Sequence, residues 1–320
     1  MNTPFHRALV IRGGALGDFL LTLPVLASLR EAAPDARLEI LAYPGLASVA
    51  KSAGFVDAVR PIEYGPLAGF FTHGAILDPA LRDYFASFDL VLSYLYDPDD
   101  IFAGNLHASG VRRLIRGPHR IAEGAHAIDQ LAAPLADLGI PMAGRAVRLG
   151  FDPAPTEPPT MAIHPGSGSS AKNWAPSKWA DLAHSLLAEF PAPVRLAVIG
   201  GEADTAALEP LRPLAETGRV VFWENLPLPD LAGRLSGCRV YLGHDTGISH
   251  LAAAAGTPSL LLFGPTDPSV WAPPHEHVRY LRAPGGDLDG VSTGTVLSAV
   301  GRIGAMPRLA SGGIGMNHPA

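Results

Sequence analysis

The sequence predicts an α/β protein made of two Rossmann-like parallel-sheet domains in tandem. Three observations support this prediction. Apolar strand patterns alternate with helical patterns along both halves of the 320-residue chain, as they do in proteins built from βαβ units. Each half opens with a short apolar run followed by a glycine-rich loop. Ten residues that include four prolines separate the two halves.

The first half, residues 1–150, opens with a predicted strand at 8–11, a glycine loop at 12–18 and a helix at 19–29. This order of elements begins a Rossmann-like unit. Later in this half the pattern predicts strands at 38–41, 56–62 and 90–94 and a helix at 126–138.

The proline-rich segment 151–160 reads as a stiff linker and marks the predicted domain boundary. The second domain, residues 151–310, repeats the same alternation. Its predicted strands are 161–164, 194–200, 220–222, 240–242 and 258–263, and its predicted helices are 176–190, 202–216, 229–236 and 248–255. Residues 311–320 are expected to form a flexible tail.

Composition narrows the class of protein. With 48% apolar and 17% charged residues the chain should be globular with a substantial core. Its single cysteine, Cys238, excludes an internal disulfide framework and a cysteine-based zinc site. The sequence shows no signal-peptide pattern and no apolar run long enough to span a bilayer, so a cytoplasmic location is expected. The net charge of −6 argues against nucleic-acid binding.

The first glycine loop ends in a carboxylate, Asp18, where the following helix begins. The glycines at 13, 14 and 17 do not match the GxGxxG spacing of dinucleotide-binding proteins. Asp18 could be a helix N-terminal carboxylate stabilised by the helix dipole. It could also be a general base, if a substrate hydroxyl comes within hydrogen-bond reach.

The loop that opens the second half, HPGSGSSAKNW from His164 to Trp174, suits a diphosphate. Small residues let the backbone approach a ligand, and Ser169 and Ser170 precede Lys172 just before a helix N-terminus. The loop does not fit the Walker pattern of P-loop ATPases. The structural alternative is a flexible linker.

Three further positions could bind the same ligand. Asp245, Thr246 and Gly247 form a polar break between the strand at 240–242 and the next helix, where parallel sheets bind ligands. Glu202 follows the strand at 194–200 and could accept hydrogen bonds from a ribose, or be an ordinary first-turn carboxylate. His250, four residues after Thr246, has a structural role unless other evidence assigns one.

Two charged clusters occur in the first half. Asp97, Asp99 and Asp100 could hold a divalent ion, but a polar loop after a strand is the simpler interpretation, and no metal site is predicted. The basic cluster could be a solvated face, but in an acidic protein it is better suited to an anionic acceptor. It consists of Arg112, Arg113, Arg116, His119 and Arg120.

Three segments together resemble glycosyltransferase family 9, the heptosyltransferases of lipopolysaccharide core assembly. They are RALVIRGGALGDFLLTLPVLASLR near the start, HPGSGSSAKNWAPSKWADLA in the middle, and GHDTGISHLAAAAGTPSLLLFGPTDPSVWAP near the end. The resemblance implies a GT-B fold, in which two Rossmann-like domains face a cleft. The acceptor then binds the N-terminal half, residues 1–150, and an ADP-sugar binds the C-terminal half.

The resemblance also implies roles for individual residues. Asp18 matches the catalytic base that deprotonates the acceptor hydroxyl. The donor-binding positions match Ser169, Ser170, Lys172, Glu202, Asp245, Thr246, Gly247 and His250. This family inverts the anomeric centre and needs no metal, so no cofactor is expected besides the ADP-sugar co-substrate. Residues 61–121 carry no motif that identifies the acceptor.

The function expected from the sequence is therefore an inverting, metal-independent transfer of a heptose or related sugar. The donor is an ADP-sugar, and the acceptor is a lipopolysaccharide-core or similar anionic glycolipid that the enzyme meets by peripheral contact with the inner membrane surface. Two alternatives remain at this point: a nucleotide-sugar epimerase or hydrolase of the same fold, and a non-catalytic sugar-nucleotide binding module.

Overall fold

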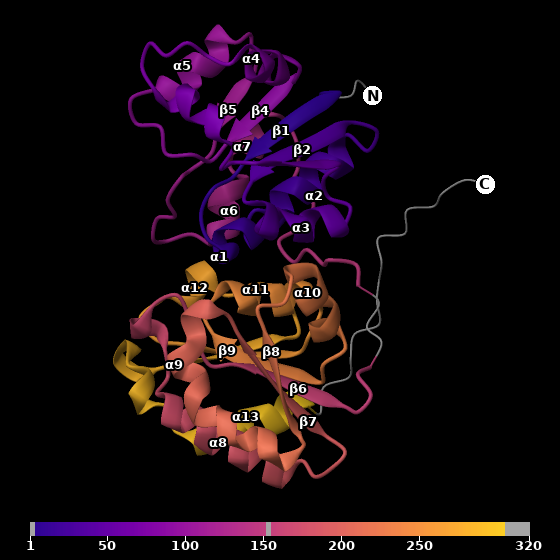
Figure 1. The fold of residues 1–320 in the computed structure, drawn as a ribbon, viewed down its shortest axis with the longest axis vertical. Helices are drawn as coiled ribbons and strands as arrows, with labels where there is room; N and C mark the ends of the chain where they lie inside the picture. The colour runs from indigo at the N-terminus through magenta and orange to yellow at the C-terminus, as the bar shows by residue number, and fades with distance from the viewer. Residues whose placement is uncertain (1–3, 152–154, 305–320) are drawn as a thin grey trace, which may run out of the picture. The chain divides into compact units, whose positions relative to one another are not determined.

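The computed structural model describes residues 4–151 and 155–304, which fall into two compact units divided between Val147 and Arg148 (Figure 1). The predicted tail at 311–320 and residues 152–154 of the predicted linker lie outside this part of the chain. No described helix is long and apolar enough to cross a membrane.

The N-terminal unit contains a five-stranded sheet in which every neighbouring pair is parallel. Its strands are β1 (Arg7–Ile11), β2 (Arg37–Ala42), β3 (Ala58–Pro61), β4 (Leu90–Ser93) and β5 (Leu114–Arg116). Their order across the sheet is β3-β2-β1-β4-β5. Strand β5 was not predicted; it contains part of the basic cluster.

Helices cover both faces of this sheet (Figure 1). They are α1 (Leu16–Leu20), α2 (Leu23–Ala32), α3 (Pro44–Ser52), the 3₁₀ helix η1 (Gly65–Phe71), α4 (Pro79–Ala86), α5 (Ile101–Ala108), α6 (Ala127–Ala132) and α7 (Pro134–Asp137). The sequence predicted single helices at 19–29 and 126–138, and each is broken in two. Pro24 and Pro134 lie at the starts of the second pieces, because proline has no N–H to continue an α-helical hydrogen-bond ladder.

The C-terminal unit contains a six-stranded parallel sheet. Its strands are β6 (Thr160–His164), β7 (Arg195–Gly200), β8 (Val220–Glu224), β9 (Val240–His244), β10 (Ser259–Phe263) and β11 (Val278–Arg282). Their order is β11-β10-β9-β6-β7-β8. The two parallel sheets confirm the predicted fold class of two α/β units.

Two helical layers enclose this second sheet. The α-helices are α8 (Pro176–Glu189), α9 (Thr205–Leu208), α10 (Leu228–Ser236), α11 (Gly247–Ala254), α12 (Pro268–Trp271) and α13 (Thr293–Gly304). The 3₁₀ helices are η2 (Ser170–Lys172), η3 (Glu202–Asp204), η4 (Glu209–Thr217), η5 (Pro284–Gly286) and η6 (Leu288–Gly290). Helices α8 and α13 pack together on one face, and α10 and α11 pack on the other (Figure 1).

The segment predicted as one helix at 202–216 is mostly 3₁₀. Pro210 begins a stretch with tighter turns, and Pro213 lies inside it. Each proline removes an N–H that an α-helix would use, so the segment forms three short pieces instead.

Each sheet has a point where the chain reverses its direction of travel across the strands. In the N-terminal unit the chain runs from β1 outward to β3 and then returns to place β4 beside β1. In the C-terminal unit it runs from β6 to β8 and then places β9 beside β6. Ligands of open α/β sheets bind beyond the carboxyl ends of the two strands at such a switch point. The loops after β1, β4, β6 and β9 are therefore the places to look for a site.

Candidate functional site

In the N-terminal unit, Asp18 follows β1 at the switch point. It lies at the third position of α1, and Oδ2 accepts a hydrogen bond from the Ala15 N–H at 3.1 Å. This is the helix-end role that the sequence left open. The side chain nevertheless stays 40% exposed, so a substrate hydroxyl can reach the carboxylate. The two roles are compatible.

Beneath Asp18 lies a buried cation, Arg12, which the sequence analysis did not select. Its guanidinium donates two hydrogen bonds to the Asp18 carbonyl oxygen, at 3.3 and 3.2 Å, and lies 3.5 Å from Oδ1. The guanidinium also lies over the Tyr94 ring at 5.5 Å. Burial lowers the pKa of Arg12, although the charge of Asp18 opposes this effect. Arginine stays protonated in proteins, so this side chain fixes a positive charge below the loop.

In the C-terminal unit, the loops after β6 and β9 meet through an ion pair. Lys172 Nζ lies 2.8 Å from Asp245 Oδ2. The aspartate side chain is buried at 7% exposure, whereas the lysine side chain is 32% exposed. The buried Asp245 carboxylate therefore holds the Lys172 ammonium in place, while part of the lysine side chain stays accessible to solvent. A partly exposed lysine beside the N-terminus of α11 presents two sources of positive potential to an anion.

The end of the Lys172 loop is anchored in the core by Trp174, which is fully buried. Its backbone N–H donates to His244 Nε2 at 2.8 Å, and its indole N–H donates to the Val291 carbonyl at 3.1 Å. Burial lowers the pKa of His244 to about 4. The imidazole is therefore neutral at physiological pH, with Nε2 available as the acceptor. The loop is thus not a flexible linker at this end.

A second cluster of polar side chains links the carboxyl ends of β6, β7 and β9. His164 Nε2 lies 3.2 Å from Asp204 Oδ2, and His164 Nδ1 lies 3.4 Å from the Thr246 hydroxyl. Asp204 also accepts a hydrogen bond from the Gly201 N–H at 2.8 Å. Burial opposes the ionisation of Asp204, but the hydrogen bonds from His164 and the Gly201 N–H outweigh it, and the pKa of Asp204 is lowered.

The remaining predicted donor residues occupy different environments. Ser169 and Ser170 are exposed at the start of η2, and Glu202 is exposed after β7. Gly247 begins α11, where Thr246 is the N-cap residue. His250 is buried within α11. The loop ends therefore offer hydroxyl, ammonium and carboxylate groups at neighbouring strand ends, while His250 lies in the interior.

The acidic cluster after β4 has a structural explanation. Both carboxylate oxygens of Asp97 accept hydrogen bonds from the first turn of α5, from Phe102 N at 3.0 Å and Ala103 N at 2.9 Å. Asp100 forms an ion pair with Arg116. Within residues 4–151 and 155–304, no three His, Cys, Asp or Glu side chains are grouped so that they could hold a metal ion.

The structure separates the basic cluster into two groups. Strand β5 runs parallel to β4, so Arg112 and Arg113 precede its amino end, whereas Arg116 ends the strand and His119 and Arg120 follow it. Only the latter group lies at the sheet edge that carries Asp18. The basic cluster is therefore divided between the two ends of β5.

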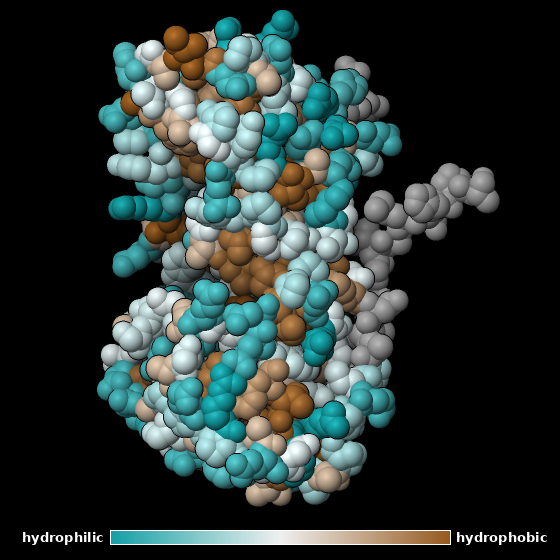
Figure 2. Space-filling model, viewed as in Figure 1, coloured by the Kyte–Doolittle hydropathy of each residue, from teal (hydrophilic) through white to brown (hydrophobic). Residues whose placement is uncertain are grey.

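Aromatic side chains accompany the second basic group. Tyr43, Tyr64 and Tyr96 are exposed in the loops that follow β2, β3 and β4, and the Tyr96 ring lies 4.7 Å from the His119 ring. These loops leave the same edge of the sheet as Asp18. On the visible face of the C-terminal unit, apolar residues form small patches among hydrophilic ones (Figure 2).

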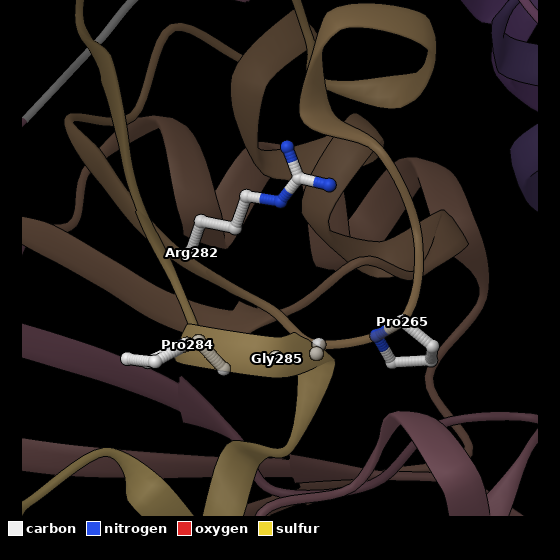
Figure 3. Close-up of a pocket in the computed structure, with 7 residues that line it drawn as sticks. Pro265, Arg282, Pro284 and Gly285 are labelled. Atoms are coloured by element: carbon white, nitrogen blue, oxygen red, sulfur yellow. The ribbon is translucent and has the colours of Figure 1, made fainter.

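A pocket of about 550 Å³ lies beyond the carboxyl ends of β10 and β11. In Figure 3, Arg282 extends from the end of β11, and Pro265, Pro284 and Gly285 lie to one side of it. The Arg282 guanidinium is 3.9 Å from Asp267, the N-cap residue of α12. This pocket lies on the opposite side of β9 from Glu202, at the other flank of the sheet.

Sequence reasoning missed Arg12, Asp204 and the partnership of His164 with both Asp204 and Thr246. A cation directly after a buried strand is a local signal that could have identified Arg12. The other contacts join residues on separate strands, and no spacing pattern indicates them.

Comparison with known proteins gives consistent matches. The model of glycosyltransferase family 9 (heptosyltransferase) matches residues 126–292, just over half of the chain. Lipopolysaccharide heptosyltransferase 1 of Pseudomonas aeruginosa is 35% identical over 117 residues, which cover 37% of this chain and 32% of that enzyme. The chain therefore aligns with only about a third of the curated relatives' length.

Solved structures match over nearly the whole chain. A glycosyl transferase family 9 structure from Veillonella parvula has a TM-score of 0.73 at 18% identity and covers 95% of this chain and 98% of its own. The E. coli heptosyltransferase WaaC with ADP has a TM-score of 0.71 at 20% identity and covers 93% and 99%. At this identity the likeness concerns the fold, and it confirms the GT-B expectation.

Proposed function

Because the chain belongs to glycosyltransferase family 9, we propose that it transfers a heptose or a related sugar from an ADP-sugar to an anionic glycolipid. The acceptor class is the lipopolysaccharide core or a similar molecule. The observation that carries the proposal is the Lys172–Asp245 pair at the switch point of the C-terminal sheet.

The donor site fits a diphosphate. Lys172 supplies a partly exposed ammonium, the N-terminus of α11 supplies backbone N–H groups, and the neighbouring residues are small. Glu202, exposed after β7, is the proposed partner of the ribose hydroxyls. The ADP bound to the E. coli enzyme of similar fold supports adenine as the base.

The chemical step assigns one role to each unit. Asp18 accepts the proton of the acceptor hydroxyl while that oxygen attacks the anomeric carbon of the donor. The bond from the anomeric carbon to the diphosphate oxygen breaks, and the configuration inverts because attack comes from the opposite face. Lys172 and the N–H groups of α11 stabilise the charge on the departing ADP. The lysine thereby performs the task that a divalent cation performs in other folds, so the proposed step needs no metal.

The acceptor site is proposed at the carboxyl edge of the N-terminal sheet. Arg116, His119 and Arg120 provide cations for phosphate or carboxylate groups. The exposed tyrosines at 43, 64 and 96 offer flat apolar surfaces with hydroxyl groups, which suit sugar rings and a membrane interface. We infer from this that the protein works in the cytoplasm with peripheral contact at the inner membrane surface.

Calorimetric titration with ADP, UDP and GDP, first without metal and then with magnesium, tests the donor assignment. We expect selective ADP binding without metal in the wild type. Binding should weaken at least about tenfold in Lys172→Ala, since a charge-assisted contact of about 1.5–3 kcal/mol is lost. Lys51→Ala, in which an exposed lysine of α3 in the N-terminal unit is removed, serves as the control.

A second assay separates transfer from the alternatives. Turnover of ADP-heptose that requires an added glycolipid supports the transferase. Equal turnover of donor alone would support an epimerase or hydrolase, and binding without any turnover would support a non-catalytic module. Preference for UDP or GDP, or binding only with magnesium, would contradict the proposed donor.

A further inference from the structure

We propose that His164 and Asp204 are positioning residues that fix the direction of the Thr246 hydroxyl at the start of α11. The inference rests on the proposed function, because it concerns the loop that would hold the donor diphosphate. It adds a hydrogen-bonded relay that runs from Asp204 through His164 to Thr246, and the first two of these residues were not predicted as site residues.

The hydrogen bond to Asp204 sets the tautomer of His164. Asp204 is ionised, and its Oδ2 lies 3.2 Å from His164 Nε2. A carboxylate can only accept, so Nε2 carries the proton. In the neutral imidazole Nδ1 then has a free lone pair. The Asp204 partner therefore sets what the opposite side of the ring can do.

Thr246 lies on the other side of the His164 ring. Its hydroxyl oxygen lies 3.4 Å from His164 Nδ1. His164 is only 4% exposed, and a buried acceptor left without a donor costs free energy. The Thr246 O–H therefore donates to Nδ1. Its oxygen remains free to accept from the Ser249 N–H at 3.4 Å, which is the N-cap hydrogen bond of α11.

The neighbouring hydroxyls agree with this direction. Ser249 Oγ donates to the His244 carbonyl oxygen, so it has no proton left to offer Thr246. The Tyr241 hydroxyl lies 3.0 Å from Ser249 Oγ and supplies a donor to it. Burial raises the pKa of Tyr241, which keeps its proton in place.

Asp204 is closely packed against the loops around it. A Cβ at Gly166 would lie 1.8 Å from Asp204 Oδ1, so the loop after β6 passes directly against the carboxylate. Asp204 also receives the Gly201 N–H from the end of β7. The relay thus joins the loops after β6, β7 and β9, and its last member, Thr246, directly follows Asp245, the partner of Lys172.

The relay determines which groups at the start of α11 can donate hydrogen bonds to a diphosphate. With the Thr246 proton directed at His164 and its oxygen engaged as the cap, the hydroxyl does not donate to a diphosphate. The donors presented at this helix end are the backbone N–H groups of its first turn, which have no partner within the helix, together with Lys172. The relay holds these backbone N–H groups in a fixed position relative to the Lys172 ammonium.

Two substitutions of His164 separate positioning from stability. In His164→Asn the short amide reaches the place of Nδ1 and retains an acceptor for Thr246, but it leaves Asp204 without its partner. In His164→Gln the longer amide reaches the place of Nε2 and retains a donor for Asp204, but Thr246 loses its acceptor. His184→Asn and His184→Gln, at an exposed position on α8, are the matched controls.

We expect the order of the two variants in stability to be the reverse of their order in ADP affinity. His164→Gln should be the more stable in urea, because the buried carboxylate keeps its partner. His164→Asn should bind ADP the more tightly, with His164→Gln about tenfold weaker than the wild type. In a Thr246→Val background, His164→Gln should cause less than about a twofold further change in ADP affinity, as expected when one residue acts through the other.

A spectroscopic measurement tests the tautomer without any ligand. In protein labelled with ¹⁵N-histidine at pH 7.5, the ring signals absent from His164→Gln identify His164. They should show a protonated Nε2 and an unprotonated Nδ1. A protonated Nδ1, or an ADP affinity that follows stability across the variants, would overturn the inference. Failure of the wild type to bind ADP would instead contradict the proposed function, and the tautomer would still be read from the free protein.

Discussion

The guanidinium of Arg12 donates two hydrogen bonds to the backbone carbonyl of Asp18 and lies 3.5 Å from its carboxylate. The exposed acid is therefore fixed from below by a buried cation and from the side by the Ala15 N–H. A carboxylate held in this way has a defined direction before any substrate binds, which is what a general base requires.

Replacing Asp18 with asparagine should remove the base and preserve the local structure, because the amide oxygen can still accept the Ala15 N–H. We expect kcat to fall about 100-fold or more, while ADP affinity in calorimetry stays within about twofold of the wild type. Asp35→Asn, at an exposed position before β2, is the control. A kcat within a factor of two of the wild type would show that Asp18 is only a helix-end residue.

Gly14 should be intolerant of alanine for two separate reasons. Its φ is +95°, and a Cβ would lie 2.9 Å from Asp18 Oδ2. Gly124 has a φ of +94°, and a Cβ added there would meet no atom within 4 Å, so Gly124→Ala reproduces the backbone strain alone. Both variants should lose about 1–2 kcal/mol of stability in urea unfolding, but only Gly14→Ala should lose kcat. Equal kcat in the two variants would argue against a close dependence of activity on the Asp18 carboxylate position.

Gly166 should also be intolerant, in the C-terminal unit. Because a Cβ there would overlap Asp204 Oδ1 at 1.8 Å, Gly166→Ala must displace the loop that leads to Lys172. We expect the ADP dissociation constant to rise at least about tenfold, equivalent to about 1.4 kcal/mol. Gly233→Ala, in α10 and with open space around it, should bind ADP as the wild type does. If both variants bind equally well, the loop position does not control donor binding.

Burial of His244 predicts an acid-dependent loss of stability. The unfolded imidazole binds a proton near pH 6.5, but the folded one binds it only near pH 4. The unfolded state is therefore favoured progressively as pH falls from 6.5 to 4, by up to about 3 kcal/mol at the lower end. Urea unfolding at pH 7 and pH 5 measures the effect.

His244→Gln is the variant for this measurement, since its amide oxygen can still accept the Trp174 N–H. It should show a smaller difference in unfolding free energy between the two pH values, whereas His184→Gln should keep the wild-type difference. An unchanged difference in His244→Gln would mean that other groups cause the acid sensitivity.

The division of the basic cluster by β5 predicts unequal roles for arginines of equal charge. Arg120 follows the strand at the edge that carries Asp18, whereas Arg112 precedes it. Arg120→Gln should weaken binding to phosphatidylglycerol-containing vesicles about fivefold, since one basic residue at an anionic surface contributes about 1 kcal/mol. Arg112→Gln removes the same charge and should change binding less than twofold. Equal losses measured by sedimentation would favour a general charge effect.

Local sequence patterns predicted most strands and the position of both glycine loops, because apolar runs and glycines act over a few residues. They failed where prolines divided helices, as at Pro24 and Pro134. Strand order could not be predicted, because the pairing of β1 with β4 joins segments about eighty residues apart. The contact of His164 with Asp204 was missed for the same reason, whereas Lys172 and Asp245 were each found from their own loops.

Strands β1 and β6, from which the two glycine-rich loops depart, each have a hydrogen-bonded neighbour on both sides. Their amides should therefore exchange with solvent only through the largest openings of each sheet, while those of β5 and β8 at the edges exchange sooner. Each glycine-rich loop therefore departs from a strand that is hydrogen-bonded on both sides, so motion at the tip of the loop leaves its starting point fixed.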